Sequence, residues 1–523
     1  MKLTNFVAGD NRSQGWQIAF LAAVAAIVVF AVFYWEGNQG FDLWDEGFLW
    51  YGAQRVLLGE VPIRDFMSYD PGRYYWVAAH MKLISSNGIM SMRFAAAVFQ
   101  AMGIFTALLL LSSASNKRGT PFVVFSALVL VVWMYPLYKS FDISISIILI
   151  FGIALLFKNP TNSCYFFVGM LVGLIAVFGR NHGVYGIFAG LSTMIYFACY
   201  HKSASRFSWS FLVWVMGVVV GYSPVILMAV AYPGFVDALW RSIQFLFEIK
   251  ATNLAVPVPW PWTVPTLGLF GLGTVKAYLL GAFFIAILVF PIALVVLEIW
   301  KKKDMVRIPP ALLSSAVLSV PYIHYAYSRP DTLHLAMGIA PLVIGCLAWL
   351  ATQKVSVKWI FSCLLFFAGL IVMAPLHPGW VCYNSQICVD TEVGEDRLSV
   401  HPNVPVELGF LKKLVERFAP NRESFLITPF WPGAYAALNR KSPTWEIYAL
   451  FPRTAIFENS EIDRIYAANL AFVMIIDVAL DGKEALRFRN THPTINQYIY
   501  ENFDRIQGYT PNDAYQLYIP KRQ

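Results

Sequence analysis

The sequence is dominated by long apolar runs separated by short polar segments. Runs of this length can cross the roughly 30 Å hydrocarbon core of a bilayer as helices. The first run lacks a small-residue cleavage site followed by soluble sequence, so we interpret it as a retained anchor. We predict about eleven transmembrane helices, at roughly 16–34, 90–112, 121–136, 143–157, 164–179, 185–200, 209–231, 277–298, 309–323, 333–351 and 357–374.

Composition supports this assignment. The chain is 58% hydrophobic and 13% charged, whereas soluble domains are about 45–50% apolar and about 25% charged. Its formal charge of +8 is spread over short loops, so we expect no nucleic-acid partner. The composition is typical of a polytopic α-helical membrane protein.

Basic residues concentrate in every second loop, and therefore on one side of the predicted helices. Loops 113–120, 158–163, 201–208, 299–308 and 352–358 contain a single acid, Asp304. An excess of Lys and Arg in short loops marks the cytoplasmic side. We therefore predict a cytoplasmic N-terminus, an odd number of spans and an extracytoplasmic tail. The basic residues are Lys117, Arg118, Lys158, Lys202, Arg206, Lys301, Lys302, Lys303, Arg307, Lys354 and Lys358.

Two of the predicted external segments are long. The first, 36–89, contains two short helical patterns, Glu46–Leu58 and Arg73–Ile84, separated by a Gly-Glu-Val-Pro break. We expect these helices to lie in the membrane interface, although packing on neighbouring helices fits the same pattern. The second segment, 232–276, contains a Pro-Trp run at 257–262 that cannot continue a helix.

After residues 1–374, which we assign to the transmembrane domain, hydropathy falls. We predict a small extracytoplasmic α/β domain at 375–523. Its expected elements are strands at Ser424–Thr428, Ala471–Ile476 and Ala514–Ile519 and helices at Pro432–Leu438 and Thr494–Phe503. Cys382 and Cys388 lie just after the last span, where an oxidising compartment favours a disulfide between them.

Three carboxylates occur within five residues directly after the first apolar run, at Asp42, Asp45 and Glu46. Unpaired carboxylates are costly near hydrocarbon, so such a cluster indicates a functional site. A solvated acidic turn that ends the helix would give the same pattern.

The segment around this cluster resembles the GT-C superfamily of integral-membrane glycosyltransferases. The similarity is to the branch that contains protein O-mannosyltransferases and lipid A aminoarabinose transferases. It rests on DEGFLWYGA at 45–53, GEVPIRDF at 59–66 and YDPGRYY at 69–75, and on the order of spans, external loop and tail.

The resemblance implies a GT-C-like fold and transfer of a sugar from a polyprenyl-phosphate donor to an acceptor on the outer face of the membrane. It places the catalytic base at Asp45 and an acidic residue near Asp70, which otherwise reads as a turn residue before Pro71. It also implies a cell-envelope enzyme of the bacterial inner membrane. The expected partners are the donor, membrane lipids and an acceptor of unknown class: glycan, lipid or protein.

The chemistry of inverting transfer selects further candidates independently. A carboxylate must take the proton of the acceptor hydroxyl, cations must stabilise the leaving phosphate, and water must be excluded. The external loops provide the carboxylates Asp45, Glu46 and Asp142 and the cations Lys139, Arg180 and Arg329. Arginine suits phosphate because its planar fork binds two oxygens at once.

Several candidates also have structural interpretations. Asp142 could cap the next helix or pair with Lys139, and Arg180 could end a helix. Arg329 and Asp331 could form an ion pair, with Asp331 as the N-cap of the next span.

His182 and His334, with nearby carboxylates, are the remaining site candidates. No pair of ligands at i and i+4 supports a metal site, so we expect neither a metal nor a cofactor.

Two other functions fit the composition. One is a transporter or flippase for polyprenyl-linked glycans, which should show internal repeats with broken helices and charges near mid-span. We find no convincing repeat. The other is a ligase or polymerase that moves whole glycans between lipid carriers, and the sequence separates this reaction poorly from single-sugar transfer.

Overall fold

The computed structural model describes residues 11–114, 120–201, 204–264, 271–304, 308–385 and 387–521. These residues form two compact units. The helical unit comprises the described residues of Met1–Trp35, Ala96–Ala231 and Asn253–Trp380, and the α/β unit those of Glu36–Ala95, Tyr232–Thr252 and Val381–Gln523. Four basic residues used to predict the topology, Lys117, Arg118, Lys202 and Arg307, lie outside the described residues.

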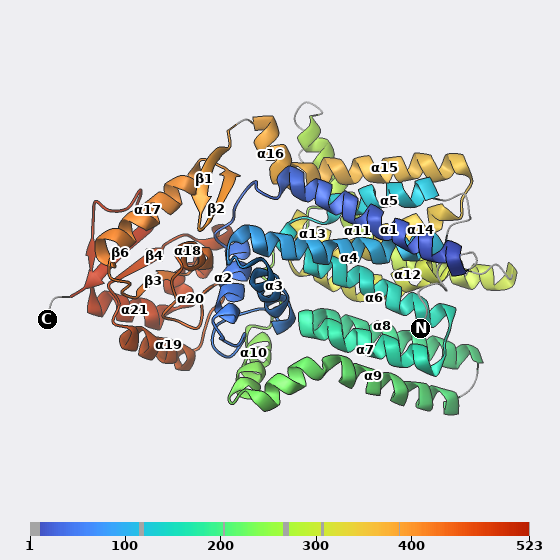
Figure 1. Cartoon of the computed structure of the whole chain (residues 1–523), viewed down its shortest axis with the longest axis horizontal. Coiled ribbons are helices and arrows are strands. Elements are labelled where there is room, and N and C mark those ends of the chain that lie inside the picture. Colours follow the sequence, from blue (N-terminus) through green and yellow to red (C-terminus); the bar gives the residue numbers. More distant parts are fainter. Residues whose placement is uncertain are drawn as a thin grey trace. The chain divides into compact units, whose positions relative to one another are not determined.

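Each predicted apolar run lies on a helix or, for the last but one run, on two consecutive helices (Figure 1). α12 packs against α6 and α14, and α5 packs against α15. The helices are α1 (Asn11–Glu36), α4 (Ile89–Ala114), α5 (Thr120–Trp133), α6 (Ser140–Lys158), α7 (Asn162–Phe178), α8 (Arg180–His201), α9 (Ala204–Ala231), α11 (Leu272–Asp304), α12 (Pro310–Ser328), α13 (Thr332–Gly338), α14 (Ala340–Ala351) and α15 (Val355–Met373).

Within the described residues, seven helices are long and apolar enough to cross a membrane. The pair α13 and α14, bent by 53°, makes up to eight. α5 and α7 are shorter apolar helices. The protein is therefore a polytopic helical membrane protein, as predicted, while the number of eleven spans stays a prediction.

Glycines determine one tight contact of the helical unit. Gly169 and Gly173 of α7 face α9, and Gly217 and Gly221 of α9 face α7. A Cβ atom on Gly169 would lie 2.1 Å from the carbonyl oxygen of Trp214. Two helices can approach this closely only where small residues recur at a spacing of four.

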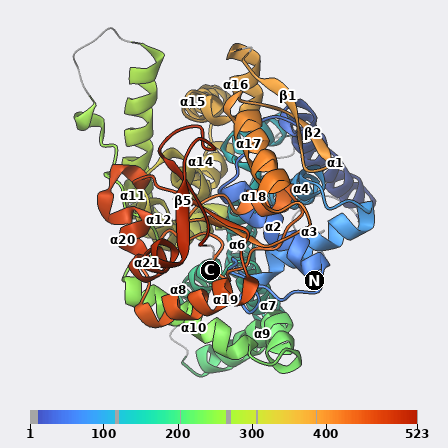
Figure 2. The same cartoon turned by 90° about the vertical axis from the view of Figure 1, so that its left-hand side faces the viewer.

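The tail of the α/β unit contains a four-stranded sheet in the order β3-β4-β6-β5. Only the β3–β4 pair is parallel. Figure 2 shows β5 beside the helices of this tail. The strands are β3 (Phe425–Thr428), β4 (Phe472–Ile476), β5 (Phe503–Ile506) and β6 (Tyr515–Pro520), and a separate hairpin pairs β1 (Val389–Val393) with β2 (Asp396–Val400).

The helices of the α/β unit include both predicted helices of the first external segment and both predicted helices of the tail. α10 lies in the segment that we interpreted as a loop, and α16, α17, α19 and α20 were not predicted. The helices are α2 (Asp45–Leu57), α3 (Pro71–Ile84), α10 (Phe235–Ile249), α16 (Pro378–Ser385, which begins in the helical unit), α17 (Asn403–Phe418), α18 (Pro432–Ala437), α19 (Ala455–Ala468), α20 (Phe488–Thr491) and α21 (Pro493–Asn502).

The predicted disulfide between Cys382 and Cys388 is confirmed. The three predicted strands of the tail are confirmed as well, with ends that differ by one residue. α2 buries most of its length within the α/β unit, so it is a packed helix. Whether it also touches the membrane interface stays a prediction.

Candidate functional site

The three carboxylates of the acidic motif have three different environments, beginning with Asp42. Its Oδ1 accepts the backbone N–H of Trp44 at 2.9 Å, and its Oδ2 accepts that of Asp45 at 3.2 Å. These bonds occupy donors at the start of α2 that no helical carbonyl can reach. Burial, with the nearby charges of Asp45 and Glu46, raises the pKa of Asp42 to about 7.

Glu46 forms a buried ion pair. Its two carboxylate oxygens accept hydrogen bonds from Nε and Nη2 of Arg93 at 2.7 and 2.8 Å. Arg93 also donates to the backbone carbonyls of Gly37, Gln39 and Gly40. Through these bonds Arg93 ties the segment before α2 and the start of α2 to the N-terminal part of α4, and Glu46 binds a permanent cation.

Asp45 is the first residue of α2, where the helix dipole favours a negative charge. Its side chain is only partly buried. A hydrogen bond joins it to the hydroxyl of Tyr448. Burial, together with the charges of Asp45 and Asp42, holds the pKa of Tyr448 well above its usual value. Tyr448 therefore stays protonated and donates to Asp45.

A second polar cluster lies inside the helical unit, around Asp142 in the first turn of α6. His182 Nε2 lies 2.8 Å from Asp142 Oδ1, and the Tyr325 hydroxyl donates to the same oxygen at 3.1 Å. The other ring nitrogen of His182 lies 2.7 Å from the Tyr322 hydroxyl. With neutral imidazole, Nε2–H donates to Asp142 and Nδ1 accepts from Tyr322.

The third cluster follows α12. Arg329 donates from Nε to Asp331 Oδ2 at 2.9 Å and from Nη1 to the carbonyl of Leu254 at 3.1 Å. Asp331 caps α13 by accepting the backbone N–H of His334 at 2.9 Å. The His334 ring lies between Asp331 and Asn253, 2.8 and 2.7 Å away. The ion pair and the N-cap proposed from the sequence are therefore both present.

These two clusters of the helical unit are joined by α12. Tyr325, which donates to Asp142, precedes Arg329 by one helical turn. The structure thus brings Asp142 and His182 together, and likewise Arg329, Asp331 and His334.

Three other candidates lie at helix starts. Lys139 ends a short 3₁₀ turn directly before α6, Arg180 begins α8, and Asp70 precedes Pro71 at the start of α3. Lys139 and Arg180 stand three and two residues from Asp142 and His182 in the sequence. Asp70 belongs to the α/β unit.

No family model matches the chain, and no curated protein matches it. Several solved structures match the chain. The crystal structure of ArnT from Cupriavidus metallidurans bound to undecaprenyl phosphate matches with a TM-score of 0.52 at 11% identity, covering 96% of this chain and 98% of that one. The apo form of ArnT matches with a TM-score of 0.56 at 10% identity, covering 97% and 98%.

This chain has the GT-C fold. The archaeal oligosaccharyltransferase AglB from Archaeoglobus fulgidus, of the same superfamily, gives a TM-score of 0.44 at 12% identity over 97% of this chain and 75% of that one. The two ArnT structures, which cover 96% and 97% of this chain, confirm the expected GT-C-like architecture.

The residues around the candidate sites that sequence reasoning missed include Arg93, Tyr322, Tyr325 and Tyr448. Arg93 and Tyr322 lie inside apolar runs, and Tyr448 lies in the tail more than 400 positions after Asp45. An arginine inside an apolar run was a usable signal, because such a charge needs a buried partner. Nothing in the sequence pairs Tyr448 with Asp45.

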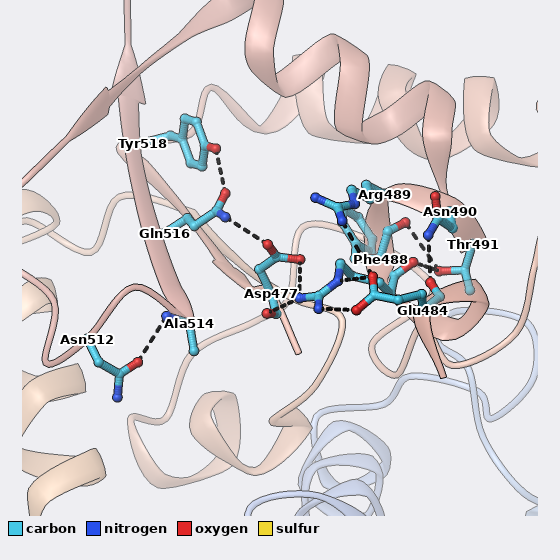
Figure 3. A network of polar contacts seen from close by, with 11 residues as sticks. Asp477, Glu484, Phe488, Arg489, Asn490, Thr491, Asn512, Ala514, Gln516 and Tyr518 are labelled. Atoms are coloured by element: carbon cyan, nitrogen blue, oxygen red, sulfur yellow. Dashed lines mark hydrogen bonds and ion pairs between the residues drawn. The ribbon is translucent and has the colours of Figure 1, made fainter. Parts of the chain in front are cut away.

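Among the described residues, no three His, Cys, Asp or Glu side chains gather as a metal ion would require. Another polar network lies in the tail, between the loop after β4 and the strand β6 (Figure 3). Gln516 donates to Asp477 at 3.0 Å, and Arg487 pairs with both Asp477 and Glu484. Glu484 is mostly exposed, and both its carboxylate oxygens pair with arginines, so we interpret this network as structural.

Proposed function

We propose that the protein is a glycosyltransferase that moves a sugar from a polyprenyl-phosphate donor to an acceptor on the outer face of the membrane, with inversion. The observation that carries this proposal is the GT-C fold, which matches over 96% of the chain an ArnT structure holding undecaprenyl phosphate. The partly exposed Asp45 at the start of α2 supplies the base that such a reaction needs.

In the proposed reaction, the acceptor hydroxyl oxygen bonds to the anomeric carbon from the face opposite the phosphate. The bond from that carbon to the phosphate oxygen breaks, and polyprenyl phosphate leaves with both electrons. The hydroxyl proton passes to Asp45. A carboxylate suffices because the hydroxyl becomes acidic only as it bonds to the electron-poor carbon. Asp142 is the second candidate carboxylate.

Arg329 is the proposed principal ligand of the donor phosphate, with Arg180 and Lys139 as helpers. Asp331 fixes Nε of Arg329, and the Leu254 carbonyl accepts from Nη1. A guanidinium held in one orientation loses less entropy when it binds phosphate oxygens. Developing charge on the leaving phosphate is stabilised most by donors that are already in place.

For location, we propose the bacterial inner membrane, with the N-terminus in the cytoplasm and the tail outside. The disulfide between Cys382 and Cys388 supports this orientation, because disulfides persist in oxidising compartments. Labelling of intact cells with a membrane-impermeant maleimide, before and after impermeant reductant, tests it. Labelling of both cysteines only after reduction is expected, and protection in intact cells but not in lysed cells would reverse the orientation.

The decisive experiment uses purified protein in lipid nanodiscs with a panel of synthetic polyprenyl-phosphate sugars. A transferase releases polyprenyl phosphate and glycosylates an acceptor or water. A transporter or flippase moves the intact donor across a vesicle membrane without cleaving it, and a ligase or polymerase joins glycans of two lipid carriers. Transfer that persists in EDTA is expected, since we propose no metal or other cofactor.

A further inference from the structure

The tail of the chain packs directly against the acidic motif. Both belong to the α/β unit, although nearly 400 residues separate them in the sequence. The backbone N–H of Gly433 donates to the carbonyl of Leu43 at 2.9 Å, between Asp42 and Trp44. A Cβ atom on Gly47 would lie 2.3 Å from Cα of Gly433, so two helix starts touch backbone to backbone.

Aromatic contacts continue this interface. The ring of Trp44, directly before Asp45, stacks on Phe430 with centroids 4.2 Å apart. The ring of Tyr448 lies 6.5 Å from Trp44 and 5.8 Å from Phe48. The backbone after Tyr448 is fixed too, because the Ala449 N–H donates to the Pro429 carbonyl at 2.9 Å. Tyr448 is 8% exposed, so packing leaves its ring little freedom.

We propose that Tyr448, a residue of the tail, is a positioning residue for Asp45: its hydroxyl donates a hydrogen bond to the carboxylate and fixes which oxygen faces the acceptor. The inference rests on the proposed role of Asp45 as the base. The bond fixes the carboxylate while leaving its second oxygen able to take a proton. It also explains what the tail contributes, since the phenol that reaches Asp45 comes from the tail.

A hydrogen bond to the charged form of a carboxylate lowers its pKa. Tyr448→Phe removes the bond and keeps the ring. The acid limb of the pH–rate profile should therefore move to higher pH, and kcat should fall roughly tenfold. The KM for the donor should stay within about twofold, because Tyr448 is not a proposed phosphate ligand. A merely structural tyrosine would change folded yield without moving the acid limb.

A second readout does not require activity. Carbodiimide labels protonated carboxyl groups, so peptide mass spectrometry across a pH series gives the labelling midpoint of Asp45, separately from that of Asp42. Tyr448→Phe should shift the Asp45 midpoint upward. If the wild-type protein transfers no sugar, the proposed function fails while this midpoint still decides whether Tyr448 acts on Asp45.

Tyr518→Phe is the matched control. Tyr518 is as buried as Tyr448, and its hydroxyl donates to Gln516 at 2.8 Å, in the network of Figure 3. Tyr518→Phe removes a comparable hydrogen bond in the same unit. It should leave the acid limb of the pH–rate profile and the labelling midpoint of Asp45 unchanged. Where Tyr448→Phe folds poorly, 3,5-difluorotyrosine at 448 keeps the ring and makes a stronger donor, which should move the acid limb to lower pH. The proposal is overturned if neither Tyr448→Phe nor the 3,5-difluorotyrosine variant moves the acid limb or the labelling midpoint of Asp45.

Discussion

The acidic motif of the α/β unit and the Asp142 cluster of the helical unit hold carboxylates in opposite ways. Glu46 is saturated by a permanent cation, Arg93, with two hydrogen bonds. Asp142 receives its bonds from a histidine and a tyrosine, whose protons can rearrange. Both carboxylates are almost fully buried, so burial alone does not separate them.

The difference indicates which carboxylate remains available for chemistry. A carboxylate that binds a guanidinium has both oxygens occupied by a permanent cation and serves the fold, whereas one that receives bonds only from neutral donors is better placed to take part in a reaction. Asp45 differs from both, because it is partly exposed and receives a neutral phenol as donor. This contrast is the reason why we propose Asp45 as the base, Glu46 as a structural residue and Asp142 as the alternative base.

The largest expected effect tests this assignment directly. Asp45→Asn keeps the size of the side chain but cannot accept the acceptor's proton, and positioned proton transfer is typically worth about 10²–10⁴-fold. We expect transfer to fall by that factor while donor affinity survives. Turnover and donor binding are measured at equal folded yield, with Asp142→Asn alongside. An active Asp45→Asn beside an inactive Asp142→Asn would move the base to the other cluster.

The free energy of unfolding should fall more when Glu46 loses its partner Arg93 than when Asp142 loses its partner Tyr325. Arg93→Met leaves the buried charge of Glu46 without its partner, and removing one member of a buried pair typically costs about 3–5 kcal/mol. Adding Glu46→Gln should restore much of that loss. Tyr325→Phe in the other cluster removes one neutral donor and should cost about 1 kcal/mol. Thermal unfolding in detergent measures all three, and equal losses for Arg93→Met and Tyr325→Phe would contradict the distinction.

Donor affinity should depend on Arg329. A hydrogen bond to a charged group is worth about 1.5–3 kcal/mol, so Arg329→Ala should weaken donor binding roughly 10- to 100-fold. Arg329→Lys should recover only part of this, because an ammonium cannot make the bidentate contact. Titration with the polyprenyl-phosphate donor gives both values. Arg487→Ala, in the structural network of the tail, is the control, and an unchanged affinity in Arg329→Ala would exclude the proposed role.

The smallest expected effect concerns Asp42. Its pKa rises from 3.8 to about 7 in the folded chain, so the folded state holds this proton more tightly than the unfolded state does. The contribution of Asp42 to stability is therefore greatest in acid and declines as the pH rises from about 4 to about 7. Asp42→Asn removes this dependence.

The melting temperature of Asp42→Asn, relative to wild type, should be about 1–3 °C higher at pH 8 than at pH 5. Scanning fluorimetry at the two values checks it. A relative melting temperature that does not change between pH 5 and pH 8 would show that the carboxyl is ionised throughout.

Local signals in the sequence were sufficient for most of the elements. Each apolar run became helical, and three strands of the tail were found to within a residue, because apolar length and alternation act over a few neighbours. α10 was missed because the proline run at 257–262 made the whole segment read as a loop, although those prolines lie after the helix ends at Ile249. β5, with only four residues, is too short to give a clear alternation.

The sequence by itself determined the membrane class, the acidic motif after the first run and the two cysteines that pair. Only the tertiary structure decided how the three acids differ, since that depends on partners distant in the chain: Arg93 for Glu46 and Tyr448 for Asp45. The physical reason is that a carboxylate's protonation depends on the donors and charges within a few ångströms. Long-range packing, as at Gly47 and Gly433, brings those groups together.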